Sequence, residues 1–86
     1  MIHPEEIKQL IENGIPNSTA IIDGHDGRHF TAIVISPEFN HKNRVQKQQA
    51  VYRTLDTYLN DGTLHAISIK TFTPEEWQQQ ETNHHG

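Results

Sequence analysis

Two spacings of hydrophobic residues run through this chain and predict two kinds of element. In some segments apolar residues recur every three or four positions, which is typical of a helix with one buried face. In others, β-branched and apolar residues follow one another without Gly or Pro, which favours strands. The predicted helices cover residues 4–13 and 44–60, and the predicted strands cover 18–23, 29–36 and 64–71.

Residues with particular backbone preferences mark the ends of these elements. Gly14 is expected to be the C-cap of the first helix, and Gly62 is expected to stop the long one. Thr73, Pro74 and Glu76 form the pattern of an N-cap, a first-turn proline and a capping box. This pattern predicts a last helix directly after the third strand.

Loops and side chains are assigned in the same way. The loop over residues 23–28 joins the first two strands, and its two glycines are expected to take positive φ. Trp77 in the last helix is expected to complete the core. The apolar stripe expected on the long helix consists of Val45, Val51, Tyr52, Leu55 and Leu59.

The predicted order α-β-β-α-β-α indicates an α+β fold. The first two strands are near enough in sequence to pair as a hairpin, and the long helix before the third strand suits a parallel crossover. We therefore expect a three-stranded mixed sheet with helices on one face, similar to the type II K-homology topology. Residues 1–77 are expected to form this single domain, followed by a disordered polar tail over residues 78–86.

The composition excludes several classes of protein. A chain of 86 residues can bury one modest core but has no room for a deep substrate cavity. The absence of cysteine excludes disulfides, thiolate catalysis and a self-contained cysteine metal site. No apolar run is long enough to span a membrane, and the N-terminus has no signal-peptide pattern. We therefore expect a cytoplasmic protein that does not associate with membranes.

Three separated blocks of the sequence resemble the BolA family. They are FTAIVISPEF at residues 30–39, RVQKQQAVY at 44–52 and LHAISIKTFTPEEW at 64–77, within a similarity that covers about residues 5–77. The blocks occur at compatible spacing, and the short hairpin loop is most like that of the IbaG branch of bacterial members. The resemblance implies a small non-enzymatic partner of monothiol glutaredoxins that shares a [2Fe–2S] cluster at their interface. It also implies links to the stress response and, for some members, DNA binding and transcriptional control.

The resemblance further implies which residues bind the cluster. It assigns His65, at the start of the third strand, as one ligand, and takes a second ligand from the hairpin loop, where this chain offers His25 and His29 as equal alternatives. Taken alone, a strand histidine is more often a hydrogen-bonded structural side chain. Imidazole ligation of one iron suits a cluster that is passed on or sensed. His41, in the turn before the long helix, is expected to be solvated.

The lack of cysteine also determines what the isolated chain can hold. The thiolate ligands of a cluster have to come from the partner and from glutathione, because this chain has none. We therefore expect no cofactor in the isolated chain, which is expected to be a monomer or a weak homodimer.

Basic residues gather in one stretch, although the net charge of the chain is −4. Four of the seven Lys and Arg residues lie within twelve positions, namely Lys42, Arg44, Lys47 and Arg53. A basic helix of this kind could contact phosphates, and the alternative function is therefore that of a nucleic-acid-binding transcriptional regulator. The more ordinary interpretation is a solvated helix face, and a third is a docking surface for an acidic partner.

Two further patterns carry little weight. Gly24-His25-Asp26-Gly27 matches the GxxG phosphate loop of K-homology domains, but it lies in a hairpin rather than between two helices. The serines have no nucleophile-elbow context, and Asp23 and Asp26 are expected to be turn formers. We therefore expect no enzymatic activity.

Overall fold

The structure is a computed structural model that describes residues 2–24, 26 and 28–83. It confirms the predicted element order, with a short 3-10 helix after the second strand and the long helix divided in two. The elements are α1 (Pro4–Gly14), β1 (Thr19–Asp23), β2 (His29–Ile35), the 3-10 helix η1 (Pro37–His41), α2 (Arg44–Thr54), α3 (Asp56–Asn60), β3 (Ala66–Phe72) and α4 (Pro74–Asn83).

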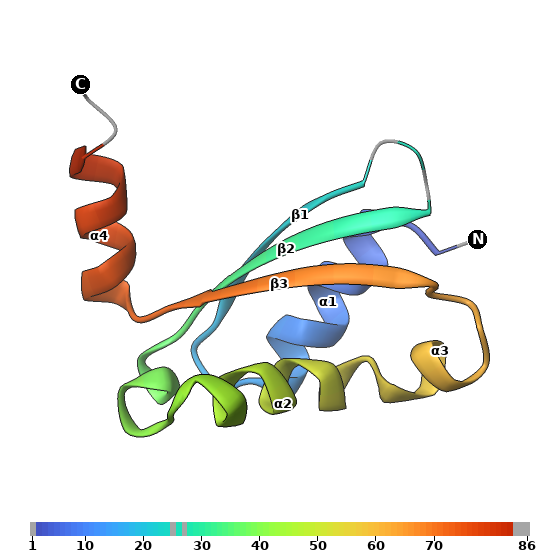
Figure 1. Ribbon diagram of the computed structural model, residues 1–86, viewed down its shortest axis with the longest axis horizontal. Helices are drawn as coiled ribbons and strands as arrows, with labels where there is room; N and C mark the ends of the chain where they lie inside the picture. Colours follow the sequence, from blue (N-terminus) through green and yellow to red (C-terminus); the bar gives the residue numbers. More distant parts are fainter. Residues whose placement is uncertain (1, 25, 27, 84–86) are drawn as a thin grey trace.

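β2 is the central strand of the sheet, whose order is β1-β2-β3 (Figure 1). β1 pairs with it in antiparallel orientation, with Ile21 opposite Ile33. β3 pairs with it in parallel orientation, with His29 opposite Ala66. The three-stranded mixed sheet and the α+β class are therefore confirmed.

One face of the sheet is covered by α1 and α2, which lie on the same side of it (Figure 1). Phe30, Ala32 and Val34 of β2 point to this side and are at most 3% exposed. They belong to one core cluster together with Ile7 and Ile11 of α1, which are fully buried. Burial of this apolar surface is the main stabilising contribution that so small a domain can make.

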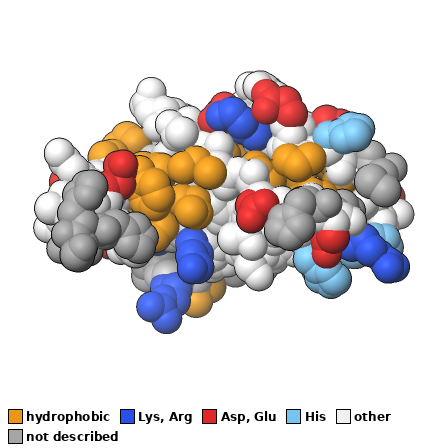
Figure 2. Space-filling view, turned by 90° about the horizontal axis from the view of Figure 1, so that it is seen from above, with side chains coloured by type: hydrophobic (Ala, Val, Ile, Leu, Met, Phe, Trp, Pro, Cys, Tyr) orange, Lys and Arg blue, Asp and Glu red, His pale blue; other side chains and the backbone are white. Residues whose placement is uncertain are grey.

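Within the described residues, no layer of helices covers the other face of the sheet (Figure 1). Thr31, Ile33 and Ile35 alternate with the buried residues of β2 and are exposed or half-buried. Ile21 of the neighbouring β1 is 45% exposed. Figure 2 looks onto this face and shows hydrophobic side chains gathered toward one end and histidine side chains at the other.

The prediction of one continuous helix over residues 44–60 is wrong, because the chain bends at Leu55. This residue has φ −109° and ψ 6°, and its N–H donates to the carbonyl oxygen of Tyr52, only three residues back. The Thr54 hydroxyl donates to the carbonyl oxygen of Val51 at 2.7 Å, a kind of side-chain bond that often bends helices. The side chain of Leu55 is fully buried at the bend.

The apolar stripe expected on that helix is buried only in part. Val51 and Leu55 are fully buried and Leu59 packs against the core. Val45 and Tyr52, by contrast, are 62% and 39% exposed. They are seven positions apart and so share one side of α2, about 100° around the helix from Val51. Only the Val51 side faces the sheet, so the expected stripe was too wide.

The glycines differ in what they do. Gly14 lies in the last turn of α1 and is not its C-cap, which is the next residue, in an extended conformation. A Cβ on Gly14 would lie 2.5 Å from Cγ2 of Thr54, so this position allows the close approach of α1 to α2. Gly62 has the positive φ (82°) predicted for a helix stop. Gly24 has no positive φ, contrary to expectation, and Gly27 lies outside the described residues.

The last helix begins as predicted but ends later. The Thr73 N–H donates to Oε1 of Glu76 at 2.8 Å, and the Glu76 N–H donates to Oγ1 of Thr73 at 3.2 Å, which confirms the capping box. α4 then continues to Asn83, so the expectation of a disordered tail is wrong for residues 78–83. These are mostly Gln, Glu and Thr, and Gln and Glu are good helix formers even where no apolar face is buried.

Trp77 does not join the core, contrary to prediction. It is half-buried, and its ring lies against that of Phe72 with the ring centroids 5.3 Å apart. Phe72 is opposite Ile35 in the sheet register, on the face that α1 and α2 leave uncovered. α4 therefore lies beyond the end of the sheet and outside the covering layer of helices (Figure 1).

Candidate functional site

Parallel pairing of β2 and β3 places the starts of both strands at one edge of the sheet. His29 is the first residue of β2 and lies opposite Ala66, the first residue of β3. His65 immediately precedes Ala66. Because neighbouring strands are about 4.8 Å apart, the backbones of His29 and His65 are close together. Both residues are exposed.

A hydrogen-bonded turn holds His29 at this edge. Oδ1 of Asp26 accepts hydrogen bonds from the backbone N–H groups of Arg28 and His29, each at 2.9 Å. The other carboxylate oxygen, Oδ2, lies 3.1 Å from Nδ1 of the His29 ring. The Asp26 carboxylate therefore contacts both the backbone and the ring of His29.

These hydrogen bonds keep Asp26 ionised. The backbone N–H groups of His29 and Arg28, followed by the His29 ring, hold the pKa of the Asp26 carboxyl well below its usual range, because each donor stabilises the charged form. At neutral pH Asp26 is thus a negatively charged acceptor beside the imidazole of His29.

The remaining histidines have different surroundings. His3 is exposed at the N-cap of α1. His25, the alternative loop ligand, lies outside the described residues, as do His84 and His85. His41 is exposed in η1, which follows the opposite end of β2 from His29 (Figure 1). Among the described histidines, the strand register therefore places the backbones of His29 and His65 close together.

The two imidazoles at this edge are of a kind that can bind a metal ion. Neutral imidazole is a good ligand for iron and other borderline metals. Within residues 2–24, 26 and 28–83, no group of three or more His, Cys, Asp or Glu side chains is placed to hold a metal ion. Both histidines are exposed, so their rings are open to solvent.

The four candidate phosphate-binding residues do not form one surface. Arg44 and Arg53 are nine positions apart on α2 and so point in opposite directions around it. Lys47 lies near Glu76 of α4, whose pKa is lowered mainly by a backbone hydrogen bond and further by the charge of Lys47. Lys42 lies before α2, at the end of η1. The sequence cluster is thus divided between different sides of the molecule.

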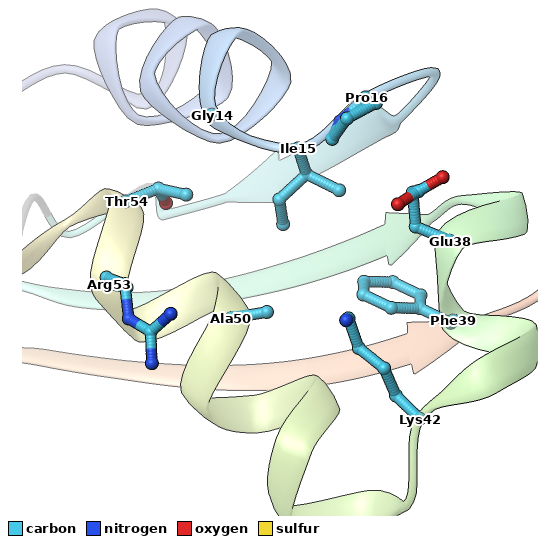
Figure 3. A pocket seen from close by; sticks show the side chains of 9 residues that line it. All are labelled: Gly14, Ile15, Pro16, Glu38, Phe39, Lys42, Ala50, Arg53 and Thr54. Carbon is cyan, nitrogen blue, oxygen red and sulfur yellow. The ribbon is translucent and has the colours of Figure 1, made fainter.

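Lys42 and Arg53 line a cavity of about 350 Å³ between η1, α2 and the end of α1 (Figure 3). Ile15 and Phe39 contribute apolar walls, and the carboxylate of Glu38 lies on the opposite side from the two cations. A carboxylate in this position repels phosphate, so the cavity is a poor match to a nucleic-acid backbone.

Comparison with known proteins agrees with the three sequence blocks. The sequence profile of the BolA-like protein family matches residues 9–76. The chain belongs to the BolA family. It is 40% identical to the acid stress protein IbaG of Escherichia coli K12 over 72 residues, which is 84% of each chain.

Solved BolA structures share the fold. A BolA homologue from Coxiella burnetii superimposes with a TM-score of 0.79 and 37% sequence identity, covering 91% of this chain and 99% of that one. A further relative is the DNA-binding transcriptional regulator BolA of Haemophilus influenzae. It is 40% identical over 52 residues, which is 60% of this chain and 50% of that protein.

Sequence reasoning pointed to His65, His29 and His25, but not to the contact of Asp26 with the His29 ring. The prediction that Asp26 forms a turn is confirmed by its bonds to the backbone. Its contact with the His29 ring was missed. The signal was the spacing, because an aspartate three residues before a histidine can fold back over it in such a turn.

Within the part of the chain that the structure describes, no helix is long and apolar enough to cross a membrane. BolA proteins are not known enzymes, and neither the family match nor the described side chains point to catalysis.

Proposed function

We propose that this BolA protein pairs with a monothiol glutaredoxin and shares a [2Fe–2S] cluster with it, in iron–sulfur trafficking or in sensing of iron or stress. The observation that carries the proposal is the position of His29, the first residue of β2, and of His65, just before the parallel β3, at one exposed edge. Two imidazoles can complete a cluster whose other ligands are thiolates of the glutaredoxin and of glutathione.

The uncovered face of the sheet supports the proposal by offering a surface next to this edge. Thr31, Ile33 and Ile35 follow His29 on the same side of β2 and are exposed or half-buried. A partner that reaches His29 can also cover these side chains. Burial of their apolar surface would add to the affinity without any change in the core.

The test is to produce the chain together with a monothiol glutaredoxin and glutathione and to record visible absorption and circular dichroism of the purified complex. We expect a cluster spectrum that His65→Ala abolishes or strongly shifts. His41→Ala is the matched control, since it removes an exposed histidine at the other end of β2. A native spectrum in His65→Ala would rule out this ligand.

The second ligand is tested in the same way. We propose His29, because the register brings it beside His65. His29→Ala should alter the spectrum, whereas His25→Ala should leave it unchanged. The reverse result would assign the ligand to His25. Two native spectra would mean that the hairpin supplies no ligand.

Nucleic-acid binding is the second candidate function, and the Haemophilus influenzae relative named as a DNA-binding regulator favours it. The candidate residues are Lys42, Arg44, Lys47 and Arg53. Their positions on different sides of the molecule and the net charge of −4 argue against tight binding by the isolated chain. The two functions are compatible, since a bound cluster could control access to nucleic acid.

A further inference from the structure

We propose that Asp26 is a positioning residue that holds His29 in the tautomer with the proton on Nδ1, so that Nε2 is the nitrogen free to coordinate metal. The inference rests on the proposed function, because it specifies how one of the two proposed ligands is prepared. It assigns to Asp26 a role beyond that of a turn former.

The geometry gives the interaction a direction. Oδ1 of Asp26 accepts from two backbone N–H groups at 2.9 Å each. With Oδ1 held in this way, Oδ2 is directed to Nδ1 of His29 at 3.1 Å. The position of the second oxygen is therefore set by the local backbone and does not depend on a freely rotating side chain.

The chemistry of the two groups then selects the tautomer. An ionised carboxylate can only accept hydrogen bonds, whereas a neutral imidazole carries one N–H donor and one acceptor nitrogen. Nδ1 must be the donor if it is to bond to Asp26. The lone pair of the neutral ring then lies on Nε2, at the far side of the ring from the carboxylate.

The strength of this contact depends on its surroundings. The His29 and Asp26 side chains are 77% and 51% exposed, so water screens the contact in the free chain. A partner that covers the edge would remove this water and strengthen the attraction. Metal-binding histidines commonly donate their second ring N–H to a carboxylate, which orients the ring and increases its basicity. We therefore expect the contact to contribute most when the complex is formed.

Asp26→Asn is the discriminating variant. Its amide oxygen can still accept from the N–H groups of Arg28 and His29, so the turn is retained. Its amide nitrogen, however, is a donor and would meet the lone pair of Nδ1, which favours the opposite tautomer with the proton on Nε2. Glu81→Gln, in exposed sequence of α4, removes the same charge elsewhere and is the control.

The first measurement uses the isolated chain without metal. Nitrogen-15 chemical shifts of the His29 ring are recorded at alkaline pH, beyond their last change with pH, and assigned by comparison with His29→Ala. The native chain and Glu81→Gln should carry the proton on Nδ1, and Asp26→Asn should carry it on Nε2. The proposal would be overturned if His29 of the native chain carried the proton on Nε2. It would also be overturned if His29 had the same tautomer in the native chain and in Asp26→Asn.

The second measurement uses the complex with glutaredoxin. Loss of the cluster to an added chelator should be about tenfold to a hundredfold faster in Asp26→Asn and unchanged in Glu81→Gln. Equal rates in Asp26→Asn and the native chain would overturn the proposal. A native complex that holds no cluster would refute the proposed function instead, and the ring-nitrogen shifts would still decide the role of Asp26.

Discussion

Two clusters in this molecule arise in different ways. The histidine edge, His29 and His65, is a cluster only in the folded structure, whereas the basic stretch at residues 42–53 is a cluster mainly along the sequence. His29 and His65 are far apart along the chain, and parallel pairing of two strands brings them together. Arg44 and Arg53 are close in sequence, and the turn of α2 directs them to opposite sides. Proximity along a chain is therefore a weak guide to a shared surface, whereas strand register is a strong one.

The largest effect is expected from a double substitution at the histidine edge. If both histidines bind one cluster, His29→Ala and His65→Ala together should lose little more than either change alone, because each single change already removes most of the site. The cluster content of the four complexes, measured as iron and sulfide per complex, checks this. Strictly additive losses would mean that the two residues act independently.

The next prediction compares the buried residue at the bend after α2 with an exposed residue of α2. Leu55→Ala should lower the free energy of unfolding by about 2–5 kcal/mol, because it empties a fully buried position at the bend. Val45→Ala, at a position 62% exposed, should change it by less than about 0.5 kcal/mol. Urea unfolding of both variants provides the measurement. Similar losses of stability in the two variants would show that Val45, like Leu55, is buried, as the stripe predicted from sequence requires.

A smaller effect is expected where β3 leads into α4, at the opposite end of the strand from His65. Thr73→Ala removes the N-cap hydroxyl and should cost about 0.5–2 kcal/mol. Urea unfolding near neutral pH, with Thr82→Ala as a control on an exposed residue of α4, provides the comparison. Equal stability of Thr73→Ala and the native chain would contradict a contribution from the cap.

The same cap should make stability depend on pH in a defined direction. The pKa of Glu76 is lowered from 4.5, chiefly by the backbone N–H of Thr73. Its folded pKa lies below its unfolded one, so its contribution is present above about pH 4.5 and is lost as pH falls through the folded pKa. Unfolding of Glu76→Gln between pH 3 and pH 7 should show a weaker decline on the acid side. Parallel curves for the variant and the native chain would assign the acid loss to other carboxylates.

The smallest effect is expected at the basic residues. Each phosphate contact contributes close to one unit to the slope of log affinity against log salt. The four cations lie on different sides of the molecule, so we test them in two pairs. The double variant Arg44→Gln with Lys47→Gln should change the salt slope for duplex DNA by no more than about two units. The double variant Lys42→Gln with Arg53→Gln should change it by no more than the same amount. Two results together would reverse our ranking of cluster sharing over nucleic-acid binding. One is tight binding of the native chain to DNA at physiological salt. The other is a slope that falls by about four units only when all four cations are replaced.

The sequence predicted the strands, their order and the capping box because each depends on local patterns. It did not predict the bend at Leu55, where the Thr54 hydroxyl bonds to the carbonyl oxygen of Val51 and the Leu55 side chain is buried. The length of α4 was missed because polar helix formers give no apolar signal. At the site, the family resemblance pointed to His65 and left His25 and His29 as alternatives. The strand register places the backbone of His29 close to that of His65, and only the turn geometry showed Asp26 against the His29 ring.

The parallel pairing of β2 and β3 also links ligand binding to folding. His65 follows His29 by 36 positions, and the unfolded chain has no reason to keep them together. Any ligand that requires both imidazoles binds the native state alone and stabilises it by RT ln(1 + [L]/Kd). The melting temperature of the chain should therefore rise with the concentration of such a ligand. Only the folded molecule can bind the ligand or pass it on.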